Sequence, residues 1–303
     1  MNEERLCAHT TFGLGGPCAA WGEARHAEEV AEIMAEMRRS HLEAIPLGGG
    51  SNVLAADEGV EMGVVHLIPP AGDEGIVELD GGGIEVMAGV ALDDVARWSV
   101  EKGKGALAWA SGIPGTVGGA VAGNAGAFGE QTGDWVVSAE VVLPDGRTCW
   151  IAGPEMGFAY RSSRFAGGRN GIIARVRLSE GAGTERETAR ARREEILALR
   201  KEKHPAIGPG LDGTAGSFFK NLPAIEPGGR RRAIGAELEK LGAKREREGG
   251  AYVSEKHANI LMAGPGATAR DVDQLARRLE GMLRQNMGIH AEREVRCWGF
   301  RLP

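Results

Sequence analysis

The chain has little cysteine and no long hydrophobic run. Its four cysteines, Cys7, Cys18, Cys149 and Cys297, are scattered over 303 residues, with no C-x-x-C pair and no histidines at metal-ligand spacing. We therefore expect no disulfide framework and no metal site. No apolar stretch is long enough to cross a bilayer, and the first residues contain no apolar signal-peptide segment. These absences predict a soluble, cytoplasmic protein without a membrane partner.

Acidic residues outnumber basic ones, 42 to 36. The formal net charge is −6 and the isoelectric point is near 5.8. The short basic run at 230–232 is not interleaved with aromatic residues, as it often is in proteins that bind nucleic acid. We therefore expect a small-molecule partner, no nucleic acid, and a monomer or weak homo-oligomer.

Two common nucleotide-binding fingerprints are missing. A G-x-G-x-x-G register starting at Gly13 ends on Cys18, and one starting at Gly48 ends on Val53. A phosphate-binding G-x-x-x-x-G-K-[ST] loop is absent as well. If the chain binds a dinucleotide, it does so with a different fold.

Glycine, by contrast, is abundant, at 48 of 303 residues. Much of it falls in two segments, 46–53 and 112–129, where backbone without side chains can lie against a flat or phosphorylated ligand. A single glycine cluster more often marks a turn. Both segments, however, also carry small hydroxyl or amide side chains: Ser51, Asn52, Ser111, Thr116 and Asn124. We therefore interpret the two segments as cradles for one large anionic ligand.

Hydrophobic periodicity predicts an α+β chain with its main boundary near residue 205. Helices are expected over 24–38, from the capping box at 184–187 to 203, over 233–241 and over 268–286. Strands are expected over 44–47, 76–79, 84–87, 135–143, 148–151, 172–178, 251–253 and 258–262.

Three short segments, 160–165, 217–221 and 292–296, carry side chains suited to chemistry. Taken one at a time, each also has an ordinary explanation: Arg161 as a surface ion pair, Ser217 as a turn residue and Glu294 as a solvent-facing strand position. Their order along the chain decides between the two interpretations.

Seven motifs in order resemble the UDP-N-acetylenolpyruvoylglucosamine reductases, the MurB family of peptidoglycan precursor synthesis. They are T-F-x-L-G-G at 11–16, P-L-G-G-G-S-N-V-L at 46–54, G-I-P-G-T-V-G-G-A with N-A-G-A-F-G at 112–129, Y-R-x-S-x-F at 160–165, G-S-x-F-K-N at 216–221, S-E-K-H-A-N at 254–259 and E-V-R at 294–296. A collinear set of this kind is far more specific than any one motif.

The resemblance implies an FAD-binding fold of the vanillyl-alcohol-oxidase (PCMH) type with a smaller α+β domain. It implies FAD-binding subdomains at 1–68 and 69–204, a substrate-binding domain at 205–290 and a C-terminal strand, 291–303, returning to the active site. FAD is expected to be non-covalent. The expected cofactor-binding residues are Leu47, Gly48, Gly49, Gly50, Ser51, Asn52, Val53, Ser111, Gly112, Ile113, Pro114, Gly115, Thr116, Gly118 and Asn124.

The implied reaction begins with NADPH reducing the flavin, after which UDP-N-acetylglucosamine enolpyruvate is reduced to UDP-N-acetylmuramate. Hydride goes from flavin N5 to the terminal alkene carbon, and the carbon next to the carboxylate takes a proton. Arg161 is the candidate cation for the charge that builds on the carboxylate. By the resemblance, Ser217 is the proton donor and Glu294 assists at the carboxylate, while Tyr160, Lys220 and Asn221 hold the substrate nucleotide. Lys220 is also a candidate to stabilise the Ser217 alkoxide.

Several positions depart from the family pattern: Gly13 in place of a basic residue, Leu222 inserted before Pro223, and Ile260 with Ala263 after the 254–259 motif. The short stretch after Phe165 suggests the compact subgroup without a substrate-capping insertion. Two alternatives stay open: an FAD-dependent oxidase of the same fold acting on an alcohol or sugar, and a flavin-binding module without catalysis.

Overall fold

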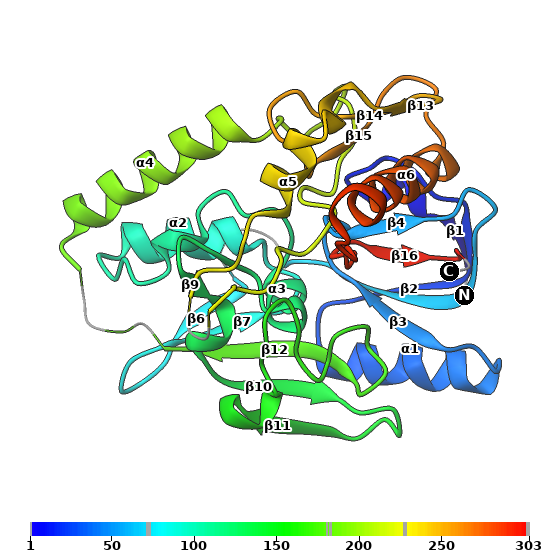
Figure 1. The fold of residues 1–303 in the computed structure, drawn as a ribbon. Helices are drawn as coiled ribbons and strands as arrows, with labels where there is room; N and C mark the ends of the chain where they lie inside the picture. Colours follow the sequence, from blue (N-terminus) through cyan, green and yellow to red (C-terminus); the bar gives the residue numbers. More distant parts are fainter. Residues whose placement is uncertain (1, 71–73, 180, 182–183, 227–228, 301–303) are drawn as a thin grey trace. The chain divides into compact units, whose positions relative to one another are not determined.

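The computed structural model describes residues 2–70, 74–179, 181, 184–226 and 229–300 (Figure 1). The chain forms two compact units, and each is built from separated stretches of sequence. Unit 1 comprises Met1–Glu4, Cys18–Gly49 and Glu61–Arg200; unit 2 comprises Arg5–Pro17, Gly50–Val60 and Lys201–Pro303. Each unit has a hydrophobic core of its own. The finer division into two FAD-binding subdomains, a substrate-binding domain and a returning strand stays a prediction.

Two sheets make up most of unit 1 (Figure 1). The first has the order β1 (Asn2–Arg5), β2 (Pro17–Ala24), β5 (Val60–Leu67), β3 (Ala44–Leu47), with β3 and β5 parallel. The second is antiparallel, with the order β11 (Thr148–Ala152), β10 (Val136–Val142), β12 (Ile172–Leu178), β7 (Ile84–Met87), β6 (Ile76–Glu78). Helix α1 (Ala27–Arg39) contacts β3, β10 and β12 and buries Val30, Met34 and Met37. One apolar helix face therefore joins the two sheets into a single core.

The remaining elements of unit 1 are α2 (Leu92–Glu101), α3 (Val117–Gly123), α4 (Arg186–Lys203, which ends in unit 2) and the short strands β8 (Gly126–Ala127) and β9 (Glu130–Gln131). Three-residue and four-residue 3₁₀ turns occur at Ala108–Ala110, Thr132–Asp134 and Gly153–Met156.

Helix α3 corrects the expectation of a continuous glycine loop over 112–129. Residues 117–123 are helical because Thr116 caps the first turn, its Oγ1 accepting from the Gly119 N–H at 3.4 Å, and because Val117 and Val121 bury their side chains. Asn124 ends the helix in the left-handed conformation, with φ of 44°. The glycines give residues 117–123 a low helix propensity, but burial of the valine side chains stabilises the helix enough to outweigh that propensity.

Unit 2 is built around α6 (Ala269–Met287). The helix buries Val272, Leu275, Ala276, Leu279 and Leu283 and contacts α5 (Ile234–Lys240) and the antiparallel sheet β13 (Arg247–Glu248), β14 (Ala251–Val253), β15 (Leu261–Ala263). A second pair, β4 (Val53–Ala55) and β16 (Arg296–Trp298), is parallel. Two 3₁₀ turns lie at Leu6–Ala8 and Ala243–Arg245.

Most of the predicted elements are confirmed, with shifted ends. The helix expected from 24 begins at Ala27, since His26 takes the extended conformation of an N-cap. The strand expected over 258–262 begins at Leu261, because a turn closed by the Ile260 N–H and the His257 carbonyl precedes it. The strands β2 and β5 and the helix α2 were not predicted.

Candidate active site

A pocket of about 350 Å³ lies in unit 1 beside the first glycine segment. Its walls combine residues of both predicted cradles with a stretch after β5 and another after β7, namely Gly48, Gly49, His66, Leu67, Pro69, Pro70, Gly89, Val90, Ala91, Asp94, Gly115 and Thr116. The prolines and Val90 give it apolar surface, and the glycines expose backbone. Its volume is at the lower end of the range for small-molecule sites, enough for part of a dinucleotide.

The two glycine segments touch at this pocket. A Cβ built on Gly49 would lie 3.2 Å from the Gly115 Cα, and one on Gly48 would collide with the Thr116 Oγ1. Only glycine permits backbones to approach this closely. Gly48, Gly49, Gly115 and Thr116, all predicted to bind the cofactor, are therefore brought together around one cavity.

Ser111 and Gly112 direct their polar groups into the protein. The buried Ser111 hydroxyl donates to the Ala108 carbonyl at 2.6 Å. The Gly112 N–H donates to the Asp93 Oδ1 at 2.7 Å, and the Arg193 guanidinium of α4 binds both oxygens of the same carboxylate at 2.6 and 3.0 Å. Burial alone would raise the pKa of Asp93, but these hydrogen bonds outweigh it and lower the pKa below its usual value. Both residues thus fix the segment that enters the cradle.

Arg161 lies at the tip of a tight turn in unit 1. The turn is closed by two backbone hydrogen bonds between Ala159 and Ser162, of 2.9 and 3.1 Å. Arg161 takes a φ of 54°, a left-handed conformation that is unfavourable for a residue with a Cβ. Its Nη2 donates to the Gly126 carbonyl at 2.9 Å, and its guanidinium lies 5.3 Å from the centre of the Tyr160 ring. Strained backbone of this kind is concentrated at functional sites.

Asn124 attaches that turn to the glycine segment. Its Nδ2 donates to the Ala159 carbonyl at 2.9 Å and to the Gln131 Oε1 at 3.1 Å, and its Oδ1 accepts from the Gly133 N–H at 2.9 Å. The side chain is 1 % exposed, so its amide is used within the protein. The structure thereby brings Asn124, Tyr160 and Arg161 together.

The rest of the first cradle, 50–53, belongs to unit 2. A Cβ on Gly50, which has a φ of 60°, would collide with the His9 carbonyl oxygen. The Asn52 Nδ2 donates to the Glu294 carbonyl at 3.1 Å, its own carbonyl accepts from the Arg296 N–H at 3.0 Å, and Val53 is paired with Arg296. Residues 50–53 are thus anchored to the 294–296 segment.

Ser217 and Glu294 lie on neighbouring extended segments of unit 2. The Phe218 carbonyl accepts from the Glu294 N–H at 2.8 Å, and Phe219 is bridged antiparallel to Arg293. Phe218 and Phe219 are buried in the unit 2 core, whereas Ser217 is partly exposed. Two of the three predicted catalytic residues are therefore held in one hydrogen-bonded framework.

Lys220 and Asn221 end the same segment. The Lys220 Nζ is 2.6 Å from the Glu292 Oε1, and its backbone N–H donates to the Glu292 carbonyl at 2.8 Å. The Asn221 Oδ1 accepts from the Ile234 N–H at 3.3 Å, at the start of α5. The Lys220 ammonium is thus paired with a carboxylate. To stabilise an alkoxide at Ser217, it would have to share or leave this contact.

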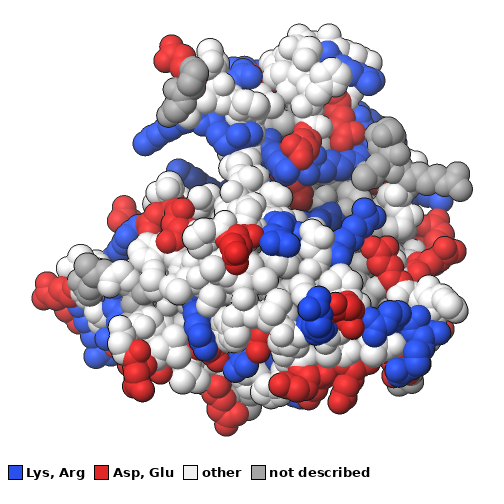
Figure 2. Space-filling model, turned by 90° about the horizontal axis from the view of Figure 1, so that it is seen from below, with Lys and Arg blue, Asp and Glu red and all other residues white. Residues whose placement is uncertain are grey.

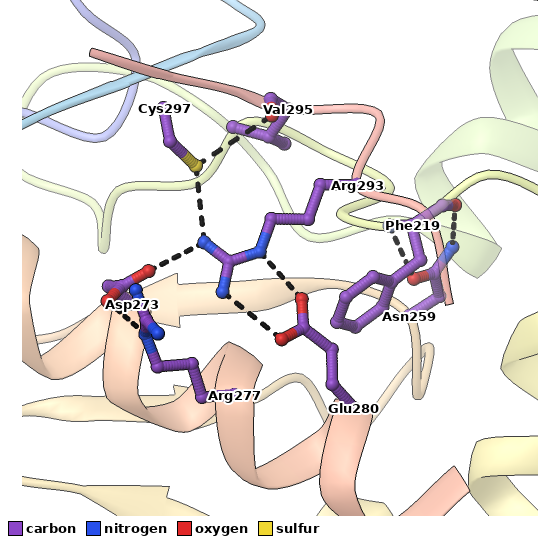
Figure 3. Close-up of polar contacts among 8 residues, drawn as sticks. All are labelled: Phe219, Asn259, Asp273, Arg277, Glu280, Arg293, Val295 and Cys297. Atoms are coloured by element: carbon purple, nitrogen blue, oxygen red, sulfur yellow. Dashed lines mark hydrogen bonds and ion pairs between the residues drawn. The ribbon is translucent and has the colours of Figure 1, made fainter. Parts of the chain in front are cut away.

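Sequence reasoning assigned no role to Arg293 or Asn259, although both lie in segments that it quoted; in the structure they support both segments (Figure 3). The Asn259 side chain accepts from the Phe219 N–H at 2.9 Å and donates to the Phe219 carbonyl at 2.8 Å. Arg293 contacts Asp273 and Glu280 of α6. The signal for this contact was two acids seven residues apart on one helix face, beside a buried stripe.

Neither the surface charge nor the metal-binding side chains indicate a further site in the described part of the chain. On the face in Figure 2, acidic and basic side chains are interspersed. Among the residues that the structure describes, no group of three or more His, Cys, Asp or Glu side chains could hold a metal ion. Over the same residues, no helix is both long and apolar enough to span a membrane.

Comparison with known proteins identifies the chain. A family model described as "FAD binding domain" matches residues 19–152, which makes this an FAD-binding protein with the α+β fold that the sequence predicted. A second model, "UDP-N-acetylenolpyruvoylglucosamine reductase, C-terminal domain", matches residues 208–298. The chain belongs to the UDP-N-acetylenolpyruvoylglucosamine reductase family, as its motifs predicted.

Full-length relatives support this assignment. The chain is 36% identical to UDP-N-acetylenolpyruvoylglucosamine reductase 2 of Symbiobacterium thermophilum, covering 98% of this chain and 91% of the relative. It is 37% identical to the reductase of Moorella thermoacetica, over 99% and 93%. The crystal structure of the Thermus caldophilus enzyme aligns with a TM-score of 0.76 at 32% identity, covering 98% of this chain and 99% of that one.

The unit 1 pocket fits the cofactor of this family. FAD presents a flat adenine, a ribose and a pyrophosphate, and the pocket offers proline and valine surface beside backbone that lacks side chains. A side chain at Gly48 or Gly49 would press on the second glycine segment and push the two cradles apart. The residues present therefore suit part of an FAD molecule.

Proposed function

We propose that this chain is an NADPH-dependent flavoenzyme that reduces UDP-N-acetylglucosamine enolpyruvate to UDP-N-acetylmuramate in peptidoglycan precursor synthesis. The observation that carries the proposal is the framework of unit 2, in which Ser217 and Glu294 lie on neighbouring hydrogen-bonded segments of a family member.

The reaction adds a hydride and a proton across an alkene. When bound, FAD carries the hydride from NADPH to the terminal alkene carbon. The chain must then stabilise the charge that develops on the substrate carboxylate and deliver a proton to the carbon beside it. Groups that stabilise this charge more strongly in the transition state than in the ground state raise the rate.

Arg161 is proposed as the cation for that carboxylate. Its turn is held by Asn124 and by the Gly126 carbonyl, so little reorganisation is needed when charge develops. Tyr160, next to the guanidinium, is proposed to contact the substrate nucleotide.

Ser217 is proposed as the proton donor, with Glu294 assisting at the carboxylate. A serine hydroxyl is a weak acid and must be held in position and supported by neighbours to act. Here the buried Phe218 and Phe219 fix the backbone after Ser217. Lys220 and Asn221 are proposed to hold the substrate phosphates and nucleotide. This requires Lys220 to share its contact with Glu292.

For FAD we propose non-covalent binding by Leu47, Gly48, Gly49, Gly50, Ser51, Asn52, Val53 and the segment that includes Ser111, Gly112, Ile113, Pro114, Gly115, Thr116, Gly118 and Asn124. The walls of the unit 1 pocket support Gly48, Gly49, Gly115 and Thr116 directly. The cradle is held in place by hydrogen bonds within the protein that Ser111, Gly112 and Asn124 make. A cytoplasmic monomer or weak homo-oligomer without a nucleic acid partner completes the proposal.

Ser217→Ala tests the proposal, with Ser138→Ala in β10 as the matched control. Flavin reduction by NADPH should survive in Ser217→Ala, while reoxidation by the enolpyruvyl sugar nucleotide should fall by about 100-fold or more, because only the second step needs the proton. Stopped-flow flavin absorbance measures both steps. Equal loss of both would make Ser217 a pocket-shaping residue.

The same assay separates the alternatives. Wild-type protein whose flavin bleaches with NADPH and regains its colour only in air would favour an oxidase of the same fold. Protein that binds flavin without reduction by NADPH would favour a non-catalytic module.

A further inference from the structure

Arg293 is an almost fully buried cation directly beside the proposed catalytic residue Glu294. Its side chain is 10% exposed, and that of Asp273 is 9% exposed. The Arg293 Nη1 is 2.6 Å from the Asp273 Oδ1, and its Nε is 2.7 Å from the Glu280 Oε1 (Figure 3). Both acids belong to α6, so the guanidinium ties the 292–296 segment to the main helix of unit 2.

The same guanidinium also touches the segment that carries Ser217. The Arg293 Cζ lies 5.6 Å from the centre of the Phe218 ring, and the Arg293 backbone forms a β-bridge with Phe219. Phe218 is fully buried and accepts the Glu294 N–H through its carbonyl. One side chain therefore contacts the neighbours of both Ser217 and Glu294.

Arg293 keeps its positive charge in the folded chain. Burial alone would lower the pKa of Arg293, but hydrogen bonds to Glu280 and Asp273 outweigh it and raise the pKa further. Arg277 adds a second cation to Asp273, with its Nε 2.7 Å from the Oδ2. The Arg293 guanidinium is therefore held by contacts from two side chains of α6.

We propose that Arg293 is a positioning residue for proton delivery, which sets the separation and orientation of Ser217 and Glu294 without touching substrate. This inference rests on the proposed function. A guanidinium suits the role because its planar donors reach two carboxylates at once while its face packs on an aromatic ring, which a lysine ammonium cannot do.

The test uses the FAD-loaded full chain with Arg293→Lys, Arg293→Met and, as control, Arg278→Met. Arg278 lies on α6 and, like Arg293, binds two acids, Glu246 and Glu248, but its side chain is 45% exposed. Arg293→Met removes a cation from the buried Asp273, which keeps Arg277, and from the partly buried Glu280. A further variant, Arg293→Met/Asp273→Asn/Glu280→Gln, therefore removes the two acids as well and keeps the fold testable.

Flavin reduction by NADPH should stay within about twofold of wild type in the triple variant and in Arg293→Lys. Flavin reoxidation by the enolpyruvyl sugar nucleotide should fall by about 10- to 100-fold in both, because displacement of catalytic groups by about 1 Å has effects of this size. The solvent deuterium isotope effect on reoxidation should rise, because proton delivery becomes slower than hydride arrival. Arg278→Met should match wild type in all three measurements.

A folded triple variant with wild-type reoxidation and isotope effect would overturn the inference, as would an equal loss in both half-reactions. Thermal unfolding and flavin content establish that each variant is folded and loaded. Wild-type enzyme that does not react with the sugar nucleotide would overturn the proposed function and this inference together. Wild-type turnover matched by every Arg293 variant would overturn this inference alone.

Discussion

Unit 1 and unit 2 hold their candidate site residues in place by different means. In unit 1 the two cradles meet at the pocket through closely approaching backbone, with Gly48 and Gly49 against Gly115 and Thr116. In unit 2 the segments with Ser217 and Glu294 are held by side chains, above all the Arg293 ion network and the Asn259 amide. The comparison teaches that a large, rigid cofactor needs shape, whereas proton delivery to one carbon needs fixed side chains.

The strongest way to break this comparison is to add one methyl group to the backbone-built cradle. We expect Gly48→Ala to weaken FAD binding by about 10- to 100-fold, because the new Cβ collides with the Thr116 Oγ1. Fluorescence titration of the apoprotein with FAD measures the loss.

Thr116→Ala in the Gly48→Ala background provides the control. It removes the oxygen that the new methyl meets, so affinity should partly recover, at the cost of the helix cap on α3. Unchanged FAD affinity in Gly48→Ala would show that the cradle tolerates a side chain, and the contrast between the units would fail.

A second, smaller effect is expected behind the cradle, where unit 1 does use charged side chains. Arg193→Met should lower the free energy of unfolding by about 1–2 kcal/mol, because Asp93 loses both hydrogen bonds from the guanidinium. The Asp93 pKa is lowered in the folded state, so wild-type stability should fall with acid below about pH 4, and the variant should lose part of that slope. Urea unfolding at several pH values measures both.

Arg190→Met on the same helix is the matched control for Arg193→Met. The Arg190–Glu187 pair is exposed, so its loss should change stability by less than about 0.5 kcal/mol. Equal effects of the two variants would mean that the Asp93 contact contributes nothing specific.

A third prediction concerns glycine in unit 2, where the backbone is not crowded at every glycine. Gly281 lies inside α6, and a Cβ there would meet no heavy atom within 4 Å. Gly281→Ala should therefore raise the free energy of unfolding by about 0.5–1 kcal/mol. In contrast, Gly63→Ala in β5 should destabilise, because its Cβ would press on Met37. Calorimetric melting of both variants tests the difference.

The smallest expected effect is a pH dependence in unit 2. Burial, and secondly Lys244, lower the pKa of His257, whose Nδ1 accepts from the Asn259 N–H. The unfolded chain therefore binds a proton more readily, and stability should fall as pH drops below about 6.5. His257→Gln should flatten the profile between that pH and the folded-state pKa. A profile unchanged by the substitution would assign the slope to other groups.

Sequence predicted the cradles because a backbone approach leaves a local mark, a run of glycines with small polar neighbours. It predicted Ser217 and Glu294 only through family motifs, since each residue alone suits a turn or strand. The pocket wall at His66 to Pro70 carried no local signal, because it depends on where β5 ends beside β7 and α2.

Two omissions had a signal that could have been used. Helix α2 buries Leu92, Val95 and Ala96, a helical spacing that the sequence displays openly. Arg293 pairs with acids 20 and 13 residues earlier, and only the fold of α6 against the last segment brings them into contact. The two acids, seven residues apart on one face of α6, signal that a cation is needed, but only tertiary packing decides that Arg293 is that cation.

The interleaved path of the chain has a consequence for dissection and gene fusion. Strand β16 near the C-terminus pairs with β4, whose residues 53–55 come from the first fifth of the sequence. Asp57, from the same early stretch, accepts the backbone N–H groups of Ala269 and Arg270 at the start of α6. A fragment beginning near residue 205 would thus expose a bare strand edge and leave the Ala269 and Arg270 N–H groups without the Asp57 carboxylate, and aggregation would follow unless residues 5–17 and 50–60 were supplied in trans.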